Sequence, residues 1–131
     1  MNDHLMQIND PRVLAELQAL YPLYETALVT NDVEALTAYF WNSPFASRFG
    51  PTENLHGFEE ITAFRRARNP TSLSRSIQRL DIVTFGRDCA QVNLEFTRSV
   101  DSSSVHGRQT QTWVRFPEGW RIVSAHVSLP A

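Results

Sequence analysis

The chain has 131 residues, of which 42% are apolar and 20% are charged, so it is large enough to bury one hydrophobic core but short for two domains. Its formal net charge of -2 and the absence of a basic run argue against a nucleic acid or an anionic membrane as a partner. We therefore expect one soluble domain over residues 1–131, with residues 1–9 as a flexible tail.

Two features of the composition bear on the site. The 12 basic residues are all arginine, whose planar fork suits bidentate binding of carboxylates, although a compositional bias toward arginine explains the count equally well. Cys89 is the only cysteine, which excludes an internal disulfide and a cysteine-based zinc site. The histidines show no metal-ligand spacing. We expect neither a metal nor a cofactor.

The N-terminal sequence MNDHLMQINDPRV has neither the basic start nor the apolar core of a signal peptide. The chain also lacks an apolar run of about 18 residues, the length that a membrane-spanning helix requires. A cytoplasmic location is the resulting expectation.

A first helix is expected to begin at Asp10 and Pro11, which form a good pair for the N-cap and the first helical position. Pro22 should kink this helix, because its ring crowds the carbonyl four residues earlier and it donates no hydrogen bond. Residues at helical spacing predict the side that faces the core: Leu14, Leu17, Tyr21, Tyr24 and Leu28.

Two further helices should follow before any long strand. Asn31 and Glu34 resemble a capping box that opens a second helix through Phe40. The segment Trp41–Pro51 reads as a loop with a short extended piece around Arg48 and Phe49, because it is rich in Asn, Ser, Pro and Gly. A third helix is predicted from Gly57 to Arg68.

The second half of the chain has strand-like segments separated by turn-forming residues, which predicts an antiparallel meander. The expected strands are Leu73–Phe85, Cys89–Val100, Gly107–Phe116 and Trp120–Leu129. Helices followed by strands are typical of the α+β class. We therefore expect three N-terminal helices packed on a strongly curved, mainly antiparallel sheet.

The last strand alternates apolar residues on both of its faces. One face would carry Val123, Ala125, Val127 and Leu129, and the other Trp120, Ile122 and His126. Because the helices cover only one face, a second subunit is the simplest cover for the other. This pattern favours a homodimer formed through the outer face of the sheet.

The third helix carries arginines on its predicted inner side. Ile61, Phe64, Arg65 and Arg68 recur at the spacing of a core-facing stripe, whereas Arg66 is expected to face solvent. A buried cation is costly unless an anion meets it. The stripe therefore hides a salt bridge or lines a pocket for an anionic ligand, and Arg68 could also simply favour the helix dipole.

Three other residues are candidates for the same pocket. Arg48 either binds a ligand or pairs with Glu53 or Glu25. Tyr24 is either a core aromatic residue or, beside arginines, a proton donor and acceptor. Glu53 is expected first to pair with an arginine, and otherwise to contact substrate or act as a base.

Strand residues complete the list of candidates. His126 is a candidate base, although a lone strand histidine is more often a satisfied core residue. Trp113 is either a core aromatic or part of a substrate-binding wall. Gln109 and Gln111 share one face of their strand, but the sequence leaves open which face lies inside.

Two long motifs resemble a known family. RFGPTENLHGFEEITAFRRAR at Arg48–Arg68 and GRQTQTWVRFPEGWRIVSAHVSL at Gly107–Leu129 resemble the AtzH-like group, which includes HpxZ-like proteins of oxalurate catabolism. This group lies within the NTF2-like superfamily, whose cone-shaped fold also holds SnoaL-like proteins and ketosteroid isomerases. The resemblance extends from Tyr24 to Leu129, with His56 at a position where a tyrosine is more usual.

The resemblance implies a small enzyme that acts beside amidases in the nitrogen catabolism of ureides, including cyanuric acid degradation. Its expected substrate is a short anionic ureide, and the expected reaction is decarboxylation of a urea dicarboxylate to allophanate or decarboxylating amide hydrolysis of an oxalurate-like acid. Arg48, Arg65 and Arg68 would hold the anion, and Tyr24 would transfer the proton.

Two other classes of function compete with this one. A non-catalytic module would bind the ureide and deliver it to a partner amidase. An isomerase or dehydratase for a larger apolar substrate would need an acidic base in an apolar pocket, and the arginines argue against that class.

Overall fold

Three helices and one six-stranded sheet make up the part of the chain that the computed structural model describes, residues 6–69 and 74–129. The helices are α1 (Pro11–Val29), α2 (Val33–Tyr39) and α3 (Phe58–Ala67). The strands are β1 (Ser47–Phe49), β2 (Asn54–His56), β3 (Ser76–Phe85), β4 (Cys89–Val100), β5 (Ser103–Phe116) and β6 (Gly119–Ser128).

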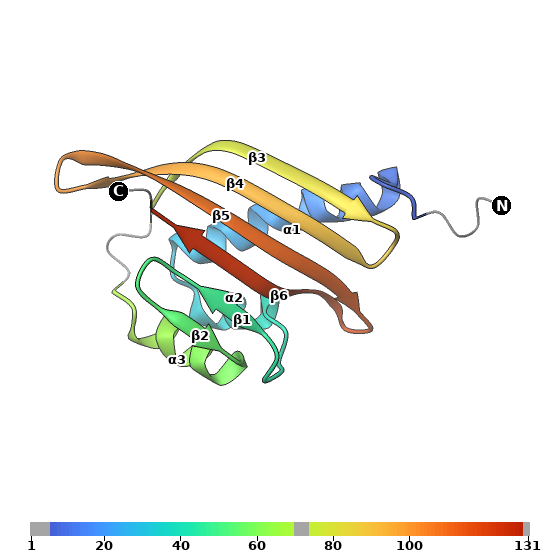
Figure 1. The fold of residues 1–131 in the computed structure, drawn as a ribbon, viewed down its shortest axis with the longest axis horizontal. Coiled ribbons are helices and arrows are strands. Elements are labelled where there is room, and N and C mark those ends of the chain that lie inside the picture. The colour runs from blue at the N-terminus through green and yellow to red at the C-terminus, as the bar shows by residue number, and fades with distance from the viewer. Residues whose placement is uncertain (1–5, 70–73, 130–131) are drawn as a thin grey trace.

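The strands lie in the order β2-β1-β6-β5-β4-β3, and every neighbouring pair is antiparallel except β1 and β6. Long strands β3 to β6 form a curved sheet, with α1 lying across one of its faces (Figure 1). The short strands β1 and β2 extend the sheet on the side of α3 (Figure 1). The predicted α+β class is confirmed.

Helix α1 begins as the sequence predicts. Asp10 is its N-cap and accepts a hydrogen bond from the backbone N–H of Arg12 at 3.0 Å, and the helix continues through Pro22. Its buried residues lie on one side and belong to the main core: Val13, Leu17, Tyr21, Tyr24, Ala27 and Leu28. None of the helices in the described residues has both the length and the apolar character of a membrane span.

The segment before α1 is paired with β3. The backbone N–H of Asn9 donates to the carbonyl of Thr84 at 3.0 Å, and the N–H of Thr84 donates to Oδ1 of Asn9 at 2.9 Å. The N–H of Gly86 donates to the carbonyl of Gln7 at 2.8 Å. The prediction of a flexible tail is therefore wrong for residues 7–9, while residues 1–5 lie outside the described part.

Two predicted boundaries differ from the structure for reasons of backbone geometry. Asp32, rather than Asn31, caps α2, and Asn31 has a φ of 51°, which lets the chain reverse after α1. Strand β5 begins at Ser103, because Asp101 and Ser102 both adopt positive φ and form a tight two-residue hairpin turn. Leu73, the predicted start of the first long strand, lies outside the described residues.

A bulge in β6 overturns the predicted alternation of that strand. Thr112 pairs with Ser124 but the next residue of β5 pairs with Ile122, so Val123 is an extra residue. An extra residue reverses the faces of everything beyond it. Ile122 and Ala125 are consequently both buried, and His126 lies on the exposed face.

The outer face of the sheet, which the sequence pattern of the last strand predicted to be buried, carries exposed polar residues. Asp81, Asn93, Thr110 and His126 occupy successive paired positions across four strands, and all four side chains are exposed. The homodimer through this face stays a prediction, and an interface there would bury polar groups as well as apolar ones.

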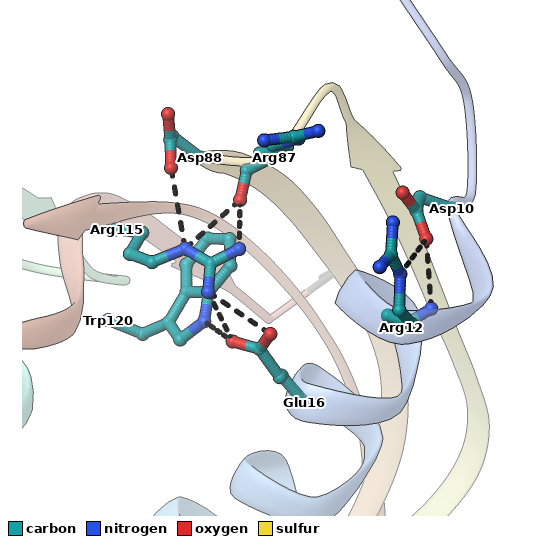
Figure 2. A network of polar contacts seen from close by, with 7 residues as sticks. All are labelled: Asp10, Arg12, Glu16, Arg87, Asp88, Arg115 and Trp120. Atoms are coloured by element: carbon teal, nitrogen blue, oxygen red, sulfur yellow. Dashed lines mark hydrogen bonds and ion pairs between the residues drawn. The ribbon is translucent and has the colours of Figure 1, made fainter.

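The end of the sheet near the start of α1 is closed by polar contacts (Figure 2). Arg115 donates to Glu16 at 2.8 Å and forms an ion pair with Asp88 at 3.3 Å, and the indole N–H of Trp120 donates to Glu16 at 2.9 Å. These contacts connect α1 to the β3–β4 turn and to the strands β5 and β6. A pocket lies at the opposite end of the sheet.

We expect Gly107→Ala to lower the free energy of unfolding by about 1–3 kcal/mol. A Cβ at Gly107 would lie 2.2 Å from Cζ of Phe96, a ring that is only 3% exposed and whose centre lies 4.5 Å from the guanidinium of Arg75. Urea denaturation measures the loss, with the exposed Ser104→Ala on the same strand as a control that should change stability by less than about 0.5 kcal/mol. Equal stability of both variants would contradict the tight packing.

Candidate functional site

A pocket of about 360 Å³ lies between the concave face of the sheet, the second half of α1 and the segment from β1 to α3. Its described lining combines charged, amide and apolar groups: Tyr24, Leu28, Arg48, Pro51, Thr52, Glu53, Phe64, Arg68, Asn69, Arg75, Phe96, Arg98, Gln109, Gln111, Ala125, Val127 and Leu129. Four arginines against one glutamate leave a net charge of +3 on this lining. A small anion is the ligand that such a surface attracts.

Arg48 is held in β1 by a salt bridge. Its Nη1 donates to Oε1 of Glu53 at 2.9 Å, and both side chains are largely buried. Burial raises the pKa of Glu53, but hydrogen bonds from Thr52 and Arg48 outweigh it and keep the pKa below its usual value. The first reading of Glu53, as a partner of arginine, is confirmed, and this pairing makes it a poor base at neutral pH.

Arg65 is the most unusual side chain of the site. It is 1% exposed, and none of its three guanidinium nitrogens meets an acceptor in good hydrogen-bond geometry among the described residues, although Tyr24 lies close enough for a weak hydrogen bond. Its guanidinium lies 4.9 Å from the centre of the Phe40 ring, directly behind the pocket lining. Burial lowers its pKa, the nearby Tyr24 opposes this, and the nearby Arg48 lowers it further.

Arg68 adds a third cation at the end of α3. Nε and Nη2 of Arg68 are buried and have no acceptor within the described part of the chain. Its guanidinium lies 5.4 Å from the centre of the Phe64 ring, and that of Arg48 lies 5.3 Å from the same ring. Burial, together with the positive charges of Arg65 and Arg48, lowers its pKa to about 10, so it remains charged at pH 7.

The stripe predicted on the third helix is thus brought together with Arg48. Ile61 and Arg65 are buried, Phe64 and Arg68 are partly buried, and Arg66 is exposed. No described acidic side chain pairs with Arg65 or Arg68, so between the two expected arrangements the geometry favours a pocket for an anion.

Tyr24 lies in the wall that faces these arginines. It is 3% exposed, lines the pocket, and lies within electrostatic reach of Arg65 and Arg68. Its ring is held by aromatic contacts with Tyr21, Tyr39 and Trp113, at centroid distances of 5.7, 5.8 and 5.9 Å. The helix and its neighbours therefore fix the position of the hydroxyl group.

A second polar cluster of the pocket was missed by the sequence reasoning. Arg75 forms a bidentate pair with Glu25, at 2.7 and 2.8 Å, and also donates to Oε1 of Gln109 at 3.2 Å. Tyr21 donates to Glu25 at 3.0 Å; burial raises its pKa, and the charge of Glu25 raises it further. Only the helical spacing of Tyr21 and Glu25 signals this cluster in the sequence.

Three of the predicted residues are not part of the described pocket lining: Arg65, which is buried, His126 and Trp113. His126 points to the outer face because of the bulge, where its ring lies 6.0 Å from that of Phe49. Trp113 is completely buried in the core and contacts Tyr24 from behind, without lining the pocket. The geometry supports neither His126 as a base nor Trp113 as a substrate contact.

The donors of the site are cations and amides rather than metal ligands. Across residues 6–69 and 74–129, no three His, Cys, Asp or Glu side chains lie close enough together to hold a metal ion. The chemistry that the arrangement supports is recognition of carboxylates together with proton transfer by a phenol.

Comparison with known proteins places the chain in a family. The AtzH-like family profile matches residues 6–131. The chain belongs to the AtzH-like family. No curated protein matches it.

Solved structures agree with this assignment. A protein of unknown function from Pectobacterium atrosepticum is 48% identical, with 95% of each chain covered and a TM-score of 0.90. A cystatin-like fold protein from Burkholderia xenovorans is 46% identical, covering 96% of this chain and 98% of that one, with a TM-score of 0.88. An NTF2-like superfamily protein from Salmonella enterica is 25% identical over 92% and 93% of the chains, with a TM-score of 0.72. The AtzH-like chain therefore has an NTF2-like fold.

Proposed function

We propose that this AtzH-like protein is a cofactor-independent enzyme that removes a carboxylate from the nitrogen of a short anionic ureide, such as a urea dicarboxylate. The observation that carries the proposal is the cluster of arginines beside Tyr24, in which buried nitrogens of Arg68, in the pocket lining, and of Arg65, outside it, meet no acceptor in good hydrogen-bond geometry among the described residues. A protein tolerates the cost of such a group most readily where a ligand supplies the missing anion.

The size and charge of the pocket fit this substrate class. A volume of about 360 Å³ is near the lower end of the roughly 300–1,000 Å³ that is usual for ligand pockets. Planar guanidinium groups bind planar carboxylates through paired hydrogen bonds. A short diacid would meet Arg48 and Arg68 in the lining, and the charge of the buried Arg65 would add to their attraction.

The proposed reaction needs one proton and no other reactant. The bond between the ureide nitrogen and the departing carboxylate carbon breaks, and the bonding electron pair remains on nitrogen. Carbon dioxide leaves, and the hydroxyl of Tyr24 protonates the nitrogen before recovering a proton from solvent. The arginines stabilise the negative charge that develops on the ureide as the bond breaks. For a urea dicarboxylate, the products are allophanate and carbon dioxide.

An isomerase of the type that uses a carboxylate base fits the site less well. Such a base needs an apolar environment that raises its pKa. Glu53, the only carboxylate in the described lining, is paired with Arg48, and its pKa is lowered.

Release of carbon dioxide from a synthetic urea dicarboxylate tests the proposal. The wild-type protein should release it above the spontaneous rate, and Arg48→Ala should lower kcat/KM by about 100-fold or more, because the substrate loses an anchoring charge. Product analysis separates decarboxylation from hydrolysis of the adjacent amide bond.

Binding measurements separate this enzyme from the competing class. A wild-type protein that binds the ureide but leaves the rate of carbon dioxide release unchanged would contradict catalysis. It would favour instead a binding protein that delivers the ureide to a partner amidase.

A further inference from the structure

The side chain of Gln111, a residue of the pocket lining, carries an unused hydrogen-bond donor. It is 1% exposed and belongs to the pocket lining. Its Oε1 accepts a hydrogen bond from the indole N–H of Trp113 at 2.9 Å. Its Nε2 is buried and meets no acceptor in the described part of the chain. A buried amide group of this kind is costly to leave without a partner.

The orientation of this amide is dictated by chemistry. An indole N–H can only donate, so the atom of Gln111 that faces Trp113 must be its oxygen. Trp113 cannot turn away, because it is completely buried and its ring contacts those of Tyr24 and Tyr39. The NH₂ group of Gln111 is therefore the part of the amide left for a ligand.

Gln109, two residues earlier on the same face of β5, provides the internal contrast. It is also buried, at 2% exposed, and it also lines the pocket. However, its Oε1 accepts from Arg75 at 3.2 Å and its Nε2 donates to the hydroxyl of Tyr21 at 3.4 Å. Both ends of Gln109 have protein partners, so only Gln111 of this pair has a donor to spare.

We infer that Gln111 is a specificity-determining residue that donates a hydrogen bond to a neutral carbonyl oxygen of the ligand. The guanidinium groups of the pocket attract carboxylates, whereas a carboxamide NH₂ is an uncharged donor that suits an amide or urea carbonyl. The pocket should then prefer an acid with a carbonyl oxygen next to its carboxylate, a ureido or amido acid, over a plain dicarboxylate. This inference rests on the proposed function only in taking the ligand to be a small anion.

Calorimetric titration with two probes tests the inference without requiring turnover. Oxalurate carries neutral carbonyl groups beside its carboxylate, whereas malonate carries carboxylates alone. Gln111→Met should weaken oxalurate binding about three- to tenfold and change malonate binding less than twofold, as expected for the loss of one hydrogen bond. Equal losses for both acids, or no loss for either, would overturn the inference.

Gln91→Met is the matched control. Gln91 lies on β4 opposite Thr112, the neighbour of Gln111, and its amide contacts Asn93 and Thr112 outside the pocket. The Gln91→Met variant should bind both acids with affinities within twofold of those of the wild type. A loss of oxalurate binding in this control equal to that of Gln111→Met would show that the effect is not specific to Gln111.

A second variant guards against failure to fold. Gln111→Glu keeps an oxygen for Trp113 but replaces the donor by a negative charge, which can pair with the arginines. We expect this variant to unfold at no lower temperature than the wild type and to bind oxalurate more than tenfold more weakly. Unchanged oxalurate binding by folded Gln111→Glu would refute a donor role.

The outcomes for the two hypotheses differ. If both acids bind the wild type and Gln111→Met keeps the same preference for oxalurate over malonate, the inference fails. The proposed function is not affected by that result. If Gln111→Met weakens the binding of oxalurate but not that of malonate, and the wild type decarboxylates no ureide, the proposed reaction fails and the inference stands.

Discussion

Replacing Tyr24 by phenylalanine should lower kcat for decarboxylation by about 10²–10⁴-fold, with substrate affinity changed only a few fold. The phenol is the proton donor in the proposed reaction, and its loss removes an interaction that matters most as the bond between nitrogen and carbon breaks. The phenylalanine ring keeps the aromatic contacts with Tyr21, Tyr39 and Trp113, so the fold should be retained. Steady-state kinetics and the thermal unfolding temperature measure the two effects.

Tyr39→Phe is the control for this prediction. Tyr39 packs edge-on against Tyr24 with a centroid distance of 5.8 Å, but it is not part of the described pocket lining. Removal of its hydroxyl should leave kcat within about threefold of the wild type. A Tyr24→Phe enzyme with nearly full kcat would eliminate the tyrosine as the proton donor.

Replacing Arg65 by methionine should make the protein more stable and at the same time abolish ligand binding. The guanidinium is buried without an acceptor in good hydrogen-bond geometry among the described residues, and the Phe40 ring and Tyr24 compensate its charge only in part. An apolar side chain of similar length in such a place should raise the free energy of unfolding by about 1–4 kcal/mol. An increase in stability accompanied by loss of function is the expected sign of a residue kept for its ligand.

The dependence of stability on ligand gives an independent measurement. A bound anion should raise the unfolding temperature of the wild type, because it binds the folded state alone, and should have no such effect on Arg65→Met. Arg66→Met, one position along α3 and exposed, should change neither stability nor binding appreciably. Destabilisation by Arg65→Met would mean that an interaction within the protein, rather than a ligand, accounts for this arginine.

The candidates on α3 could be predicted because helical spacing is a local property. Residues three, four and seven positions apart share one side of a helix whatever surrounds it. The pattern from Ile61 to Arg68 therefore identified the inner arginines and separated them from Arg66. It could not show whether an acidic side chain forms an ion pair with these arginines, since such a partner can come from any part of the chain.

The strand β6 shows why side-chain alternation is weaker information. A strict period of two predicted that His126 shares a face with Ile122. One extra residue in β6, opposite β5, reverses the faces, and nothing in the local sequence marks Val123 as that residue. The pairing of two strands places the bulge, so His126 could be located only in the folded molecule.

The sequence alone determined the family motifs, the α+β order of elements, and the stripe of apolar and cationic residues on α3. Each of these is a local property, which depends on residues close to one another in the chain. Only the tertiary structure decided which charges meet. It pairs Arg48 with Glu53 and Glu25 with Arg75, and it leaves the NH₂ group of Gln111, a residue of the pocket lining, without a partner among the described residues. The physical reason is that a buried charge or amide is stabilised by whichever group lies within about 3 Å of it. In this fold that group often comes from a distant strand or helix, as Arg75 does for Glu25, 50 positions away.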